Sequence, residues 1–113
     1  MSAVTHALFA LDEMAPGSAR RVEVDGHVIA LVRIDDDVYA LGDTCSHDDV
    51  SLSEGDVEAG DHALECWKHG AQFDLATGEP LTLPATRPVP TYEVEVIDGR
   101  VLLTVEPDEE NAR

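Results

Sequence analysis

Two stretches of the chain carry the hydrophobic and polar pattern of a β-hairpin. They are residues 21–32, centred on Asp25-Gly26, and residues 92–105, centred on Asp98-Gly99. Asp-Gly favours a two-residue type I′ turn, because both central residues need a positive φ. Before the second turn, acidic residues alternate with Tyr92, Val94 and Val96, which is the period of a strand with one face buried and one in water. Both stretches therefore predict pairs of antiparallel strands.

The rest of the chain adds further turn signals and little that favours helix. A third turn is expected at residues 35–37, leading into an apolar run at residues 38–41. No long window shows the 3.6-residue period of an amphipathic helix. Four of the six prolines fall between Pro80 and Pro90, so this segment is predicted to be an ordered irregular loop and not a central strand. The sequence predicts an all-β protein, and 113 residues fit one domain.

The net charge of the chain restricts the classes of partner that it can bind. Asp and Glu number 24 against 7 Lys and Arg, for a formal net charge of −17. Nucleic acid and anionic membrane surfaces are therefore excluded as partners, because both require clustered cations. A partner with a basic face is favoured. The apolar run at residues 7–11 is far shorter than the roughly 18 residues of a membrane span, and no basic region precedes it. We expect a cytoplasmic protein, in which two cysteines do not form a disulfide.

Two short motifs carry the candidate chemistry. They are Cys45-Ser46-His47 and Cys66-Trp67-Lys68-His69, with 18 residues between His47 and Cys66. Each motif offers one thiolate and one imidazole from a short loop, and Gly42 and Gly70 flank the pair of motifs. A structural zinc site is one interpretation, although its usual spacing pairs Cys with Cys and His with His. A [2Fe–2S] cluster in which two His replace two Cys on one iron fits the order Cys, His, Cys, His. A Cys–His nucleophilic pair, or unrelated core residues, would explain fewer of these positions.

The pattern Cys45-x-His47-x18-Cys66-x-x-His69-Gly70 resembles the signature of the Rieske-type iron–sulfur proteins. The sequence around this pattern resembles that of the small ferredoxins of multicomponent aromatic-ring dioxygenases. The similar segments are residues 43–47, 51–55, 65–66 and 73–78. On this resemblance, residues 1–106 form a single Rieske [2Fe–2S] domain and residues 107–113 form an acidic flexible tail.

The resemblance implies a fold and a ligand set. The Rieske fold has three stacked antiparallel sheets, with a cluster-binding subdomain of two loops at one tip. One [2Fe–2S] cluster per chain is implied, with Cys45 and Cys66 on the inner iron and His47 and His69 on the outer iron. A third loop, with Pro84-Ala85 by position, is expected to cover the cluster.

The chain departs from the high-potential branch of this family in three ways. It has two cysteines in all, so no disulfide can bridge the cluster loops. Trp67 stands where that branch has proline. Ala71 and Phe73 stand where that branch has a Ser and a Tyr that donate hydrogen bonds to sulfur. Because such donors stabilise the more negative reduced cluster, we expect a potential near the low end of the Rieske range of about −150 to +300 mV.

The function implied is that of a one-electron carrier from a flavin-dependent reductase to a terminal non-haem iron oxygenase. We expect a monomer that is not itself an enzyme. A Rieske oxygenase also needs a mononuclear iron held by two His and a carboxylate, whereas His6, His27 and His62 are scattered and are expected to be surface residues. The alternatives are a role in iron–sulfur cluster assembly or redox sensing, or a small subunit of nitrite reductase. Trp67 and Lys68, the single lysine, are either loop residues or partner contacts.

Overall fold

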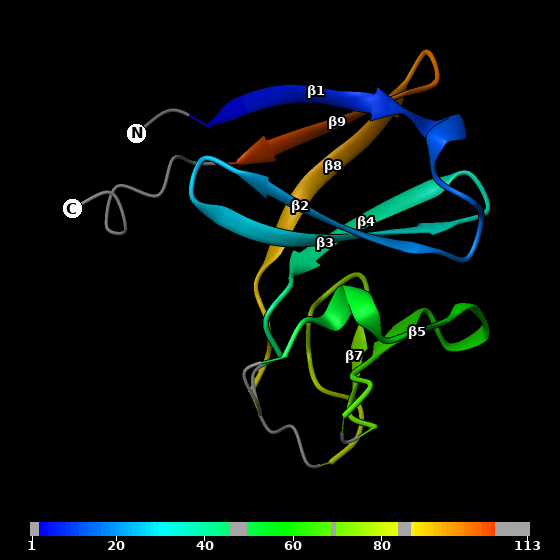
Figure 1. The fold of residues 1–113 in the computed structure, drawn as a ribbon, viewed down its shortest axis with the longest axis vertical. Coiled ribbons are helices and arrows are strands. Elements are labelled where there is room, and N and C mark those ends of the chain that lie inside the picture. Colours follow the sequence, from blue (N-terminus) through cyan, green and yellow to red (C-terminus); the bar gives the residue numbers. More distant parts are fainter. Residues whose placement is uncertain (1–2, 46–49, 69, 84–86, 106–113) are drawn as a thin grey trace.

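The structure is a computed structural model that describes residues 3–45, 50–68, 70–83 and 87–105. Its regular elements are strands and three short 3₁₀ helices, so the prediction of an all-β fold is confirmed (Figure 1). The strands are β1 Val4–Ala10, β2 Ala19–Val24, β3 His27–Ile34, β4 Asp37–Gly42, β5 Asp56–Glu58, β6 Ala63–Glu65, β7 Gln72–Asp74, β8 Thr91–Ile97 and β9 Arg100–Val105. The 3₁₀ helices are η1 Leu11–Glu13, η2 Leu52–Glu54 and η3 Ala59–Asp61. In this described part of the chain, no helix is long and apolar enough to cross a membrane.

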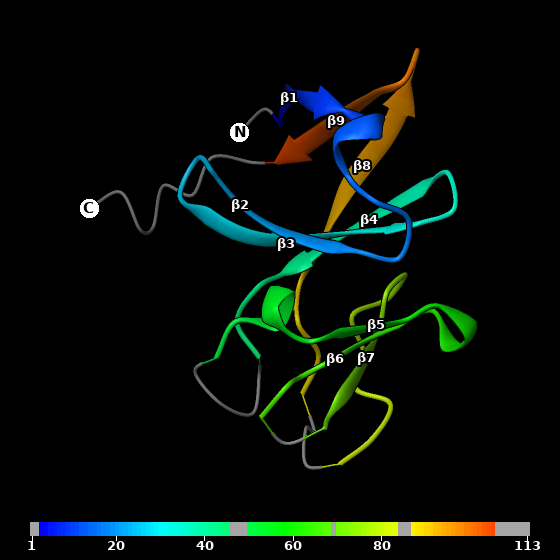
Figure 2. The same cartoon turned by 45° about the vertical axis from the view of Figure 1, so that its right-hand side comes forward.

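The strands form antiparallel layers. Six of them are hydrogen-bonded in the order β1-β9-β8-β4-β3-β2, and the other three in the order β5-β6-β7. The six-stranded sheet is narrow at its centre, where β4 meets β8 through two residue pairs, Ala40 with Tyr92 and Leu41 with Thr91. It therefore consists of two three-stranded halves, and the small sheet lies beyond them (Figure 2). This arrangement agrees with the three antiparallel layers expected from the family resemblance.

The predicted hairpin turns are confirmed. Asp25 and Gly26 have φ angles of 50° and 87°, and Asp98 and Gly99 have φ angles of 52° and 76°. The third turn is one residue shorter than expected, because Ile34 pairs directly with Asp37 and β4 already begins at Asp37.

Two hydrophobic cores lie on opposite faces of β3. Ile29 and Leu31 of β3 join the core between the two halves of the large sheet, whereas Ala30 and Val32 join a second core that contains residues of the small sheet. Successive strand residues point to opposite faces, so β3 is buried on both sides. β8 shows the predicted alternation, with half-buried Tyr92, Val94 and Val96 between exposed acidic residues.

The proline-rich segment behaves as predicted in its described parts. Residues 80–83 and 87–90 contain no strand, apart from an isolated bridge between Phe73 and Pro80. Backbone hydrogen bonds nevertheless fix the segment. Leu81 N–H donates to the carbonyl of Gln72 at 2.7 Å, and Gly42 N–H donates to the carbonyl of Pro90 at 2.7 Å. The predicted covering residues, Pro84 and Ala85, lie outside the described residues.

Candidate metal centre

The candidate cysteines belong to two loops in the half of the molecule that lies away from β1 (Figures 1 and 2). The first loop follows β4 and contains Cys45, and the second joins β6 to β7 and contains Cys66. The described parts of both loops therefore lie where the family resemblance places a cluster-binding tip. His47 and His69 lie outside the described residues.

Backbone hydrogen bonds close the first loop. The Cys45 N–H donates to the carbonyl of Val50 at 3.0 Å, and Thr44 and Ser51 form an isolated antiparallel bridge. The backbone at Thr44 and Cys45 therefore runs beside the backbone at Val50 and Ser51. This closure fixes the backbone of Cys45.

The second loop is closed in the same manner. The Cys66 N–H donates to the carbonyl of Ala71 at 2.7 Å, and the Gly70 N–H donates to the carbonyl of Cys66 at 2.9 Å. Gly70 has a φ of 76°, in the left-handed region that glycine adopts without strain. A residue with a side chain would be strained at this position, directly after the second motif. The other flanking glycine, Gly42, instead comes close to Pro90.

Thr82 joins the proline-rich segment to the second loop. Its hydroxyl oxygen accepts a hydrogen bond from the Gln72 N–H at 2.9 Å and donates to the carbonyl of Gly70 at 3.4 Å. Residues 81–83 therefore run alongside the end of the second loop, a placement that the sequence analysis did not foresee.

Gly55 sets the position of the strand that leads into Cys66. A Cβ at Gly55 would lie 1.8 Å from the carbonyl oxygen of Glu65, the residue before Cys66. We expect Gly55→Ala to lower the free energy of unfolding by about 3 kcal/mol, because the backbone at Glu65 must move. Chemical denaturation measures this. The matched control is Gly60→Ala, where an added Cβ meets nothing within 4 Å. Equal stability of the two variants would contradict the close packing of Gly55 against Glu65.

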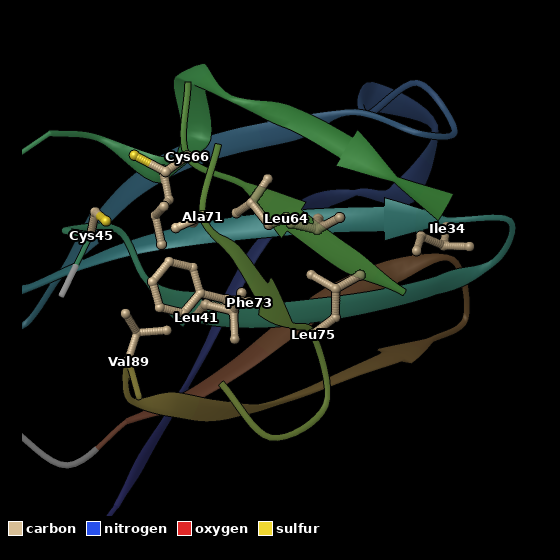
Figure 3. Packing of buried hydrophobic residues seen from close by; sticks show 12 residues of the cluster. Ile34, Leu41, Cys45, Leu64, Cys66, Ala71, Phe73, Leu75 and Val89 are labelled. Atoms are coloured by element: carbon tan, nitrogen blue, oxygen red, sulfur yellow. The ribbon is translucent and has the colours of Figure 1, made fainter. Parts of the chain in front are cut away.

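The two thiols are buried at the same end of one core. Cys45 is 3% exposed and Cys66 is fully buried, and neither forms a disulfide. Figure 3 shows both sulfur atoms at one end of the hydrophobic cluster, with Ala71 and Phe73 beside them. Ala71 and Phe73 are fully buried in that cluster. Ala71 and Phe73, which stand where the high-potential branch has hydroxyl donors, therefore lie in the same core as both thiols.

The remaining histidines have separate local partners. The His6 Nε2 lies 2.8 Å from a carboxylate oxygen of Asp25, and the His27 ring contacts Tyr92 edge-on. His62 is exposed and lies near another ring. Among the described residues, no three His, Cys, Asp or Glu side chains come together as a metal site. Of these three residues, all predicted to lie on the surface, His62 is exposed, whereas His6 and His27 are partly buried.

Exposed apolar side chains lie beside the second loop. Trp67 is 53% exposed and Leu83 is 77% exposed, while Leu81 is 48% exposed. Trp67 follows Cys66 directly, and Thr82 holds both leucines next to Gly70. The exposure of Trp67 favours the partner-contact interpretation over simple loop packing. The two leucines were not singled out from sequence, although apolar residues within a proline-rich irregular loop are a usable signal.

The described residues fit a cluster that takes two thiolates from two loops. Thiolates are the protein ligands of [2Fe–2S] clusters, and two buried, unlinked cysteines converge here from closed loops. In the sequence, each cysteine is followed within three residues by the histidine of its motif. Two thiolates and two imidazoles also suit zinc, so the donor types alone leave both metal centres open.

A family model described as "Rieske [2Fe-2S] domain" matches residues 5–93. A relative from Photorhabdus laumondii, the 3-phenylpropionate/cinnamic acid dioxygenase ferredoxin subunit, is 46% identical over 84% of this chain and 89% of its own length. Ferredoxin CarAc of Metapseudomonas resinovorans is 43% identical over 86% of this chain and 90% of its own length.

Solved structures show the same fold. The ferredoxin of carbazole 1,9a-dioxygenase from Nocardioides aromaticivorans superposes with a TM-score of 0.85 at 35% identity, covering 88% of this chain and 95% of that chain. A ferredoxin in complex with its oxygenase, also of carbazole 1,9a-dioxygenase, gives 0.82 at 40% identity, covering 92% and 95%. A nitrite reductase small subunit from Mycobacterium tuberculosis gives 0.83 at 28% identity, covering 94% and 98%.

The match to the family model over most of the chain, and the close relatives of nearly equal length, favour the iron–sulfur centre over zinc. The chain belongs to the Rieske [2Fe–2S] family, among its small ferredoxins.

Proposed function

We propose that this protein is a one-electron carrier that accepts an electron from a flavin-dependent reductase and delivers it to a terminal non-haem iron oxygenase. The observation that carries the proposal is the pair of buried thiols in two closed loops of a Rieske ferredoxin. Its relatives are named as ferredoxin subunits of dioxygenases, and a similar ferredoxin has been solved with its oxygenase. The protein is then an electron-transfer component and not the oxygenase.

Four residues are proposed to hold the cluster. Cys45 and Cys66 would ligate the inner iron, and His47 and His69 would ligate the outer iron. The cluster stores and releases one electron when it is bound. The chain contributes the closed loops that fix the backbone of Cys45 and Cys66, and the buried core around the two thiols keeps water away from their sulfur atoms. We further propose that residues 1–106 form the one functional domain, with residues 107–113 as an acidic tail.

The partner is proposed to dock where the second loop meets the proline-rich segment. Trp67, Leu81 and Leu83 expose apolar surface beside the second loop, which contains Cys66. Electron transfer requires the partner to approach this end, and desolvated apolar anchors are the usual centre of such contacts. A cytoplasmic monomer that binds neither nucleic acid nor membrane is consistent with the net charge of −17.

The direct test is reconstitution of the electron-transfer chain. Anaerobically reconstituted protein is expected to contain two iron and two acid-labile sulfide atoms per chain, as a [2Fe–2S] cluster does. After reduction by the reductase of a dioxygenase system, it is expected to support substrate oxidation by the oxygenase. A protein that holds the cluster but gives no turnover with any oxygenase encoded near its gene would count against the proposal.

A second candidate is the small subunit of a nitrite reductase, which the structural similarity to the mycobacterial protein favours. Its sequence identity of 28% is lower than the 46% and 43% of the dioxygenase ferredoxins. Co-purification with a nitrite reductase large subunit, together with nitrite-dependent oxidation of the reduced protein, would favour the second candidate.

Association with the reductase is expected to depend on salt. The formal charge of −17 attracts a partner with a basic face, and salt shortens the range of this attraction to about 10 Å at 0.1 M and about 3 Å at 1 M. The second-order rate of reduction by the reductase is expected to fall more than tenfold between these salt concentrations. Stopped-flow absorbance measures the rate.

Reduction by dithionite provides a control, because salt is expected to change its rate in the opposite direction. It is a small anion, so the acidic protein repels it, and added salt is expected to speed its reaction. A reductase rate that is flat across salt, with the dithionite rate rising, would contradict charge steering by the partner.

A further inference from the structure

Asp43 is the charged side chain that the fold buries within the described part of the chain, with 3% exposure. It follows β4 directly and stands two residues before Cys45. A buried carboxylate is costly unless hydrogen bonds and an opposite charge compensate it. The groups that compensate the buried charge of Asp43 therefore indicate its role.

Two hydrogen bonds to the carboxylate reach across the first loop. The Ser51 hydroxyl donates to Oδ2 of Asp43 at 2.5 Å, and the Ser53 N–H donates to Oδ1 at 2.9 Å. The main-chain carbonyl of Asp43 also accepts from the Leu52 N–H at 2.6 Å. Asp43 lies where the chain enters the loop, and its three partners lie where the chain leaves it. The residue therefore joins the two ends of the segment that contains Cys45.

Arg21 supplies the opposite charge. Its Nε lies 3.5 Å from Oδ2 of Asp43, and its other end lies 3.5 Å from a carboxylate oxygen of Glu23. The Arg21 and Glu23 side chains are 53% and 65% exposed. One guanidinium on β2 therefore faces one buried and one exposed carboxylate, and the buried one belongs to the first loop.

We propose that Asp43 positions the first ligand loop and that the Asp43–Arg21 pair sets the reduction potential of the cluster. This inference rests on the proposed function, because it takes Cys45 as a ligand. Reduction adds one negative charge to the cluster. A carboxylate anchored two residues from Cys45 opposes that charge, and the guanidinium favours it. Since charges interact more strongly in a buried, poorly polarisable environment, the effect of Asp43 is expected to exceed that of the exposed Glu23 carboxylate.

The two charges make opposite predictions for the potential. Asp43→Asn keeps the size of the side chain and one acceptor oxygen for the Ser53 N–H but removes the charge; the Ser51 hydroxyl can turn to accept from the new amide N–H. This variant is expected to shift the equilibrium toward the reduced protein about tenfold, which is about +59 mV for a one-electron couple. Arg21→Gln is expected to shift it the other way by a smaller factor, because Arg21 is half exposed. Voltammetry of the cluster-loaded protein measures both shifts.

Glu23→Gln is the matched control. It removes the same charge as Asp43→Asn and also removes a carboxylate partner of Arg21, but its side chain is exposed. It is expected to change the equilibrium less than twofold. The Asp43→Asn shift is expected to persist near 1 M salt, where the Debye length is about 3 Å and exposed charges are screened. Equal shifts for Asp43→Asn and Glu23→Gln would overturn the electrostatic role.

The positioning role has its own measurement. Asp43→Ala removes both side-chain acceptors, and the loaded protein is expected to lose its visible absorption several-fold faster than Asp43→Asn does. Equal rates of loss would overturn the positioning role. If Asp43→Asn does not retain a cluster, Arg21→Gln decides the electrostatic role: a fall in potential supports it and no fall overturns it. Wild-type protein that binds no iron or sulfide would instead overturn the proposed function itself.

Discussion

Cys45→Ser is expected to give a folded protein that is colourless after anaerobic reconstitution. A thiolate is the ligand that an iron–sulfur cluster needs, and a serine hydroxyl does not replace it at neutral pH because it hardly ionises. Bound iron and acid-labile sulfide are expected to fall by more than tenfold. Visible absorption, metal and sulfide analysis, and the electron paramagnetic resonance spectrum of the dithionite-reduced protein measure the loss. The same result is expected for Cys66→Ser.

Ala30→Ser is the control for this experiment. Ala30 is fully buried in the same core cluster as both cysteines, so its replacement places a similar hydroxyl in the same environment without touching a proposed ligand. The iron and acid-labile sulfide content of Ala30→Ser is expected to equal that of the wild type. A Cys45→Ser protein that remains coloured and loaded with iron and sulfide would contradict the ligand assignment.

Ala71→Ser combined with Phe73→Tyr is expected to raise the reduction potential by about 60–120 mV. Both positions are fully buried in the hydrophobic core that contains the two thiols. A hydroxyl donated to sulfur stabilises the reduced form more than the oxidised form, since the reduced form carries more negative charge. Each hydrogen bond with a differential effect of about 1.4 kcal/mol shifts a one-electron couple by about 59 mV. Voltammetry of the single and double variants separates the two contributions.

Ala63→Ser is the matched control for the potential. Ala63 is fully buried in β6, three residues before Cys66, but lies outside the core cluster that contains the thiols. Its potential is expected to stay within about 10 mV of the wild type, a shift of less than twofold in the equilibrium constant. An unchanged potential in the loaded double variant would remove the hydrogen-bond explanation for a low potential.

The hairpins were accessible from sequence because their signals are local. A two-residue Asp-Gly turn has few conformations to choose from, and the positive φ angles at Asp25 and Asp98 follow from it. The alternation along β8 is likewise a property of neighbouring residues, and the structure shows it as predicted.

The small sheet was not accessible in this way. β5, β6 and β7 have three residues each, too few for a period of two to stand out. β1 was also missed, since it pairs with β9 almost at the other end of the chain, Val4 opposite Val105. Such strands are defined by partners that are remote in sequence, so no local pattern predicts them.

The sequence by itself determined the candidate ligands, Cys45, His47, Cys66 and His69, and the all-β character of the chain. Ligand type and spacing are local properties, and so is turn chemistry. Tertiary structure alone decided that both thiols share one buried core, that Ala71 and Phe73 lie in it, and that Arg21 of β2 faces Asp43. These relations join residues that are distant in sequence, and they depend on the sheet register and on side-chain packing, which the one-dimensional pattern does not contain.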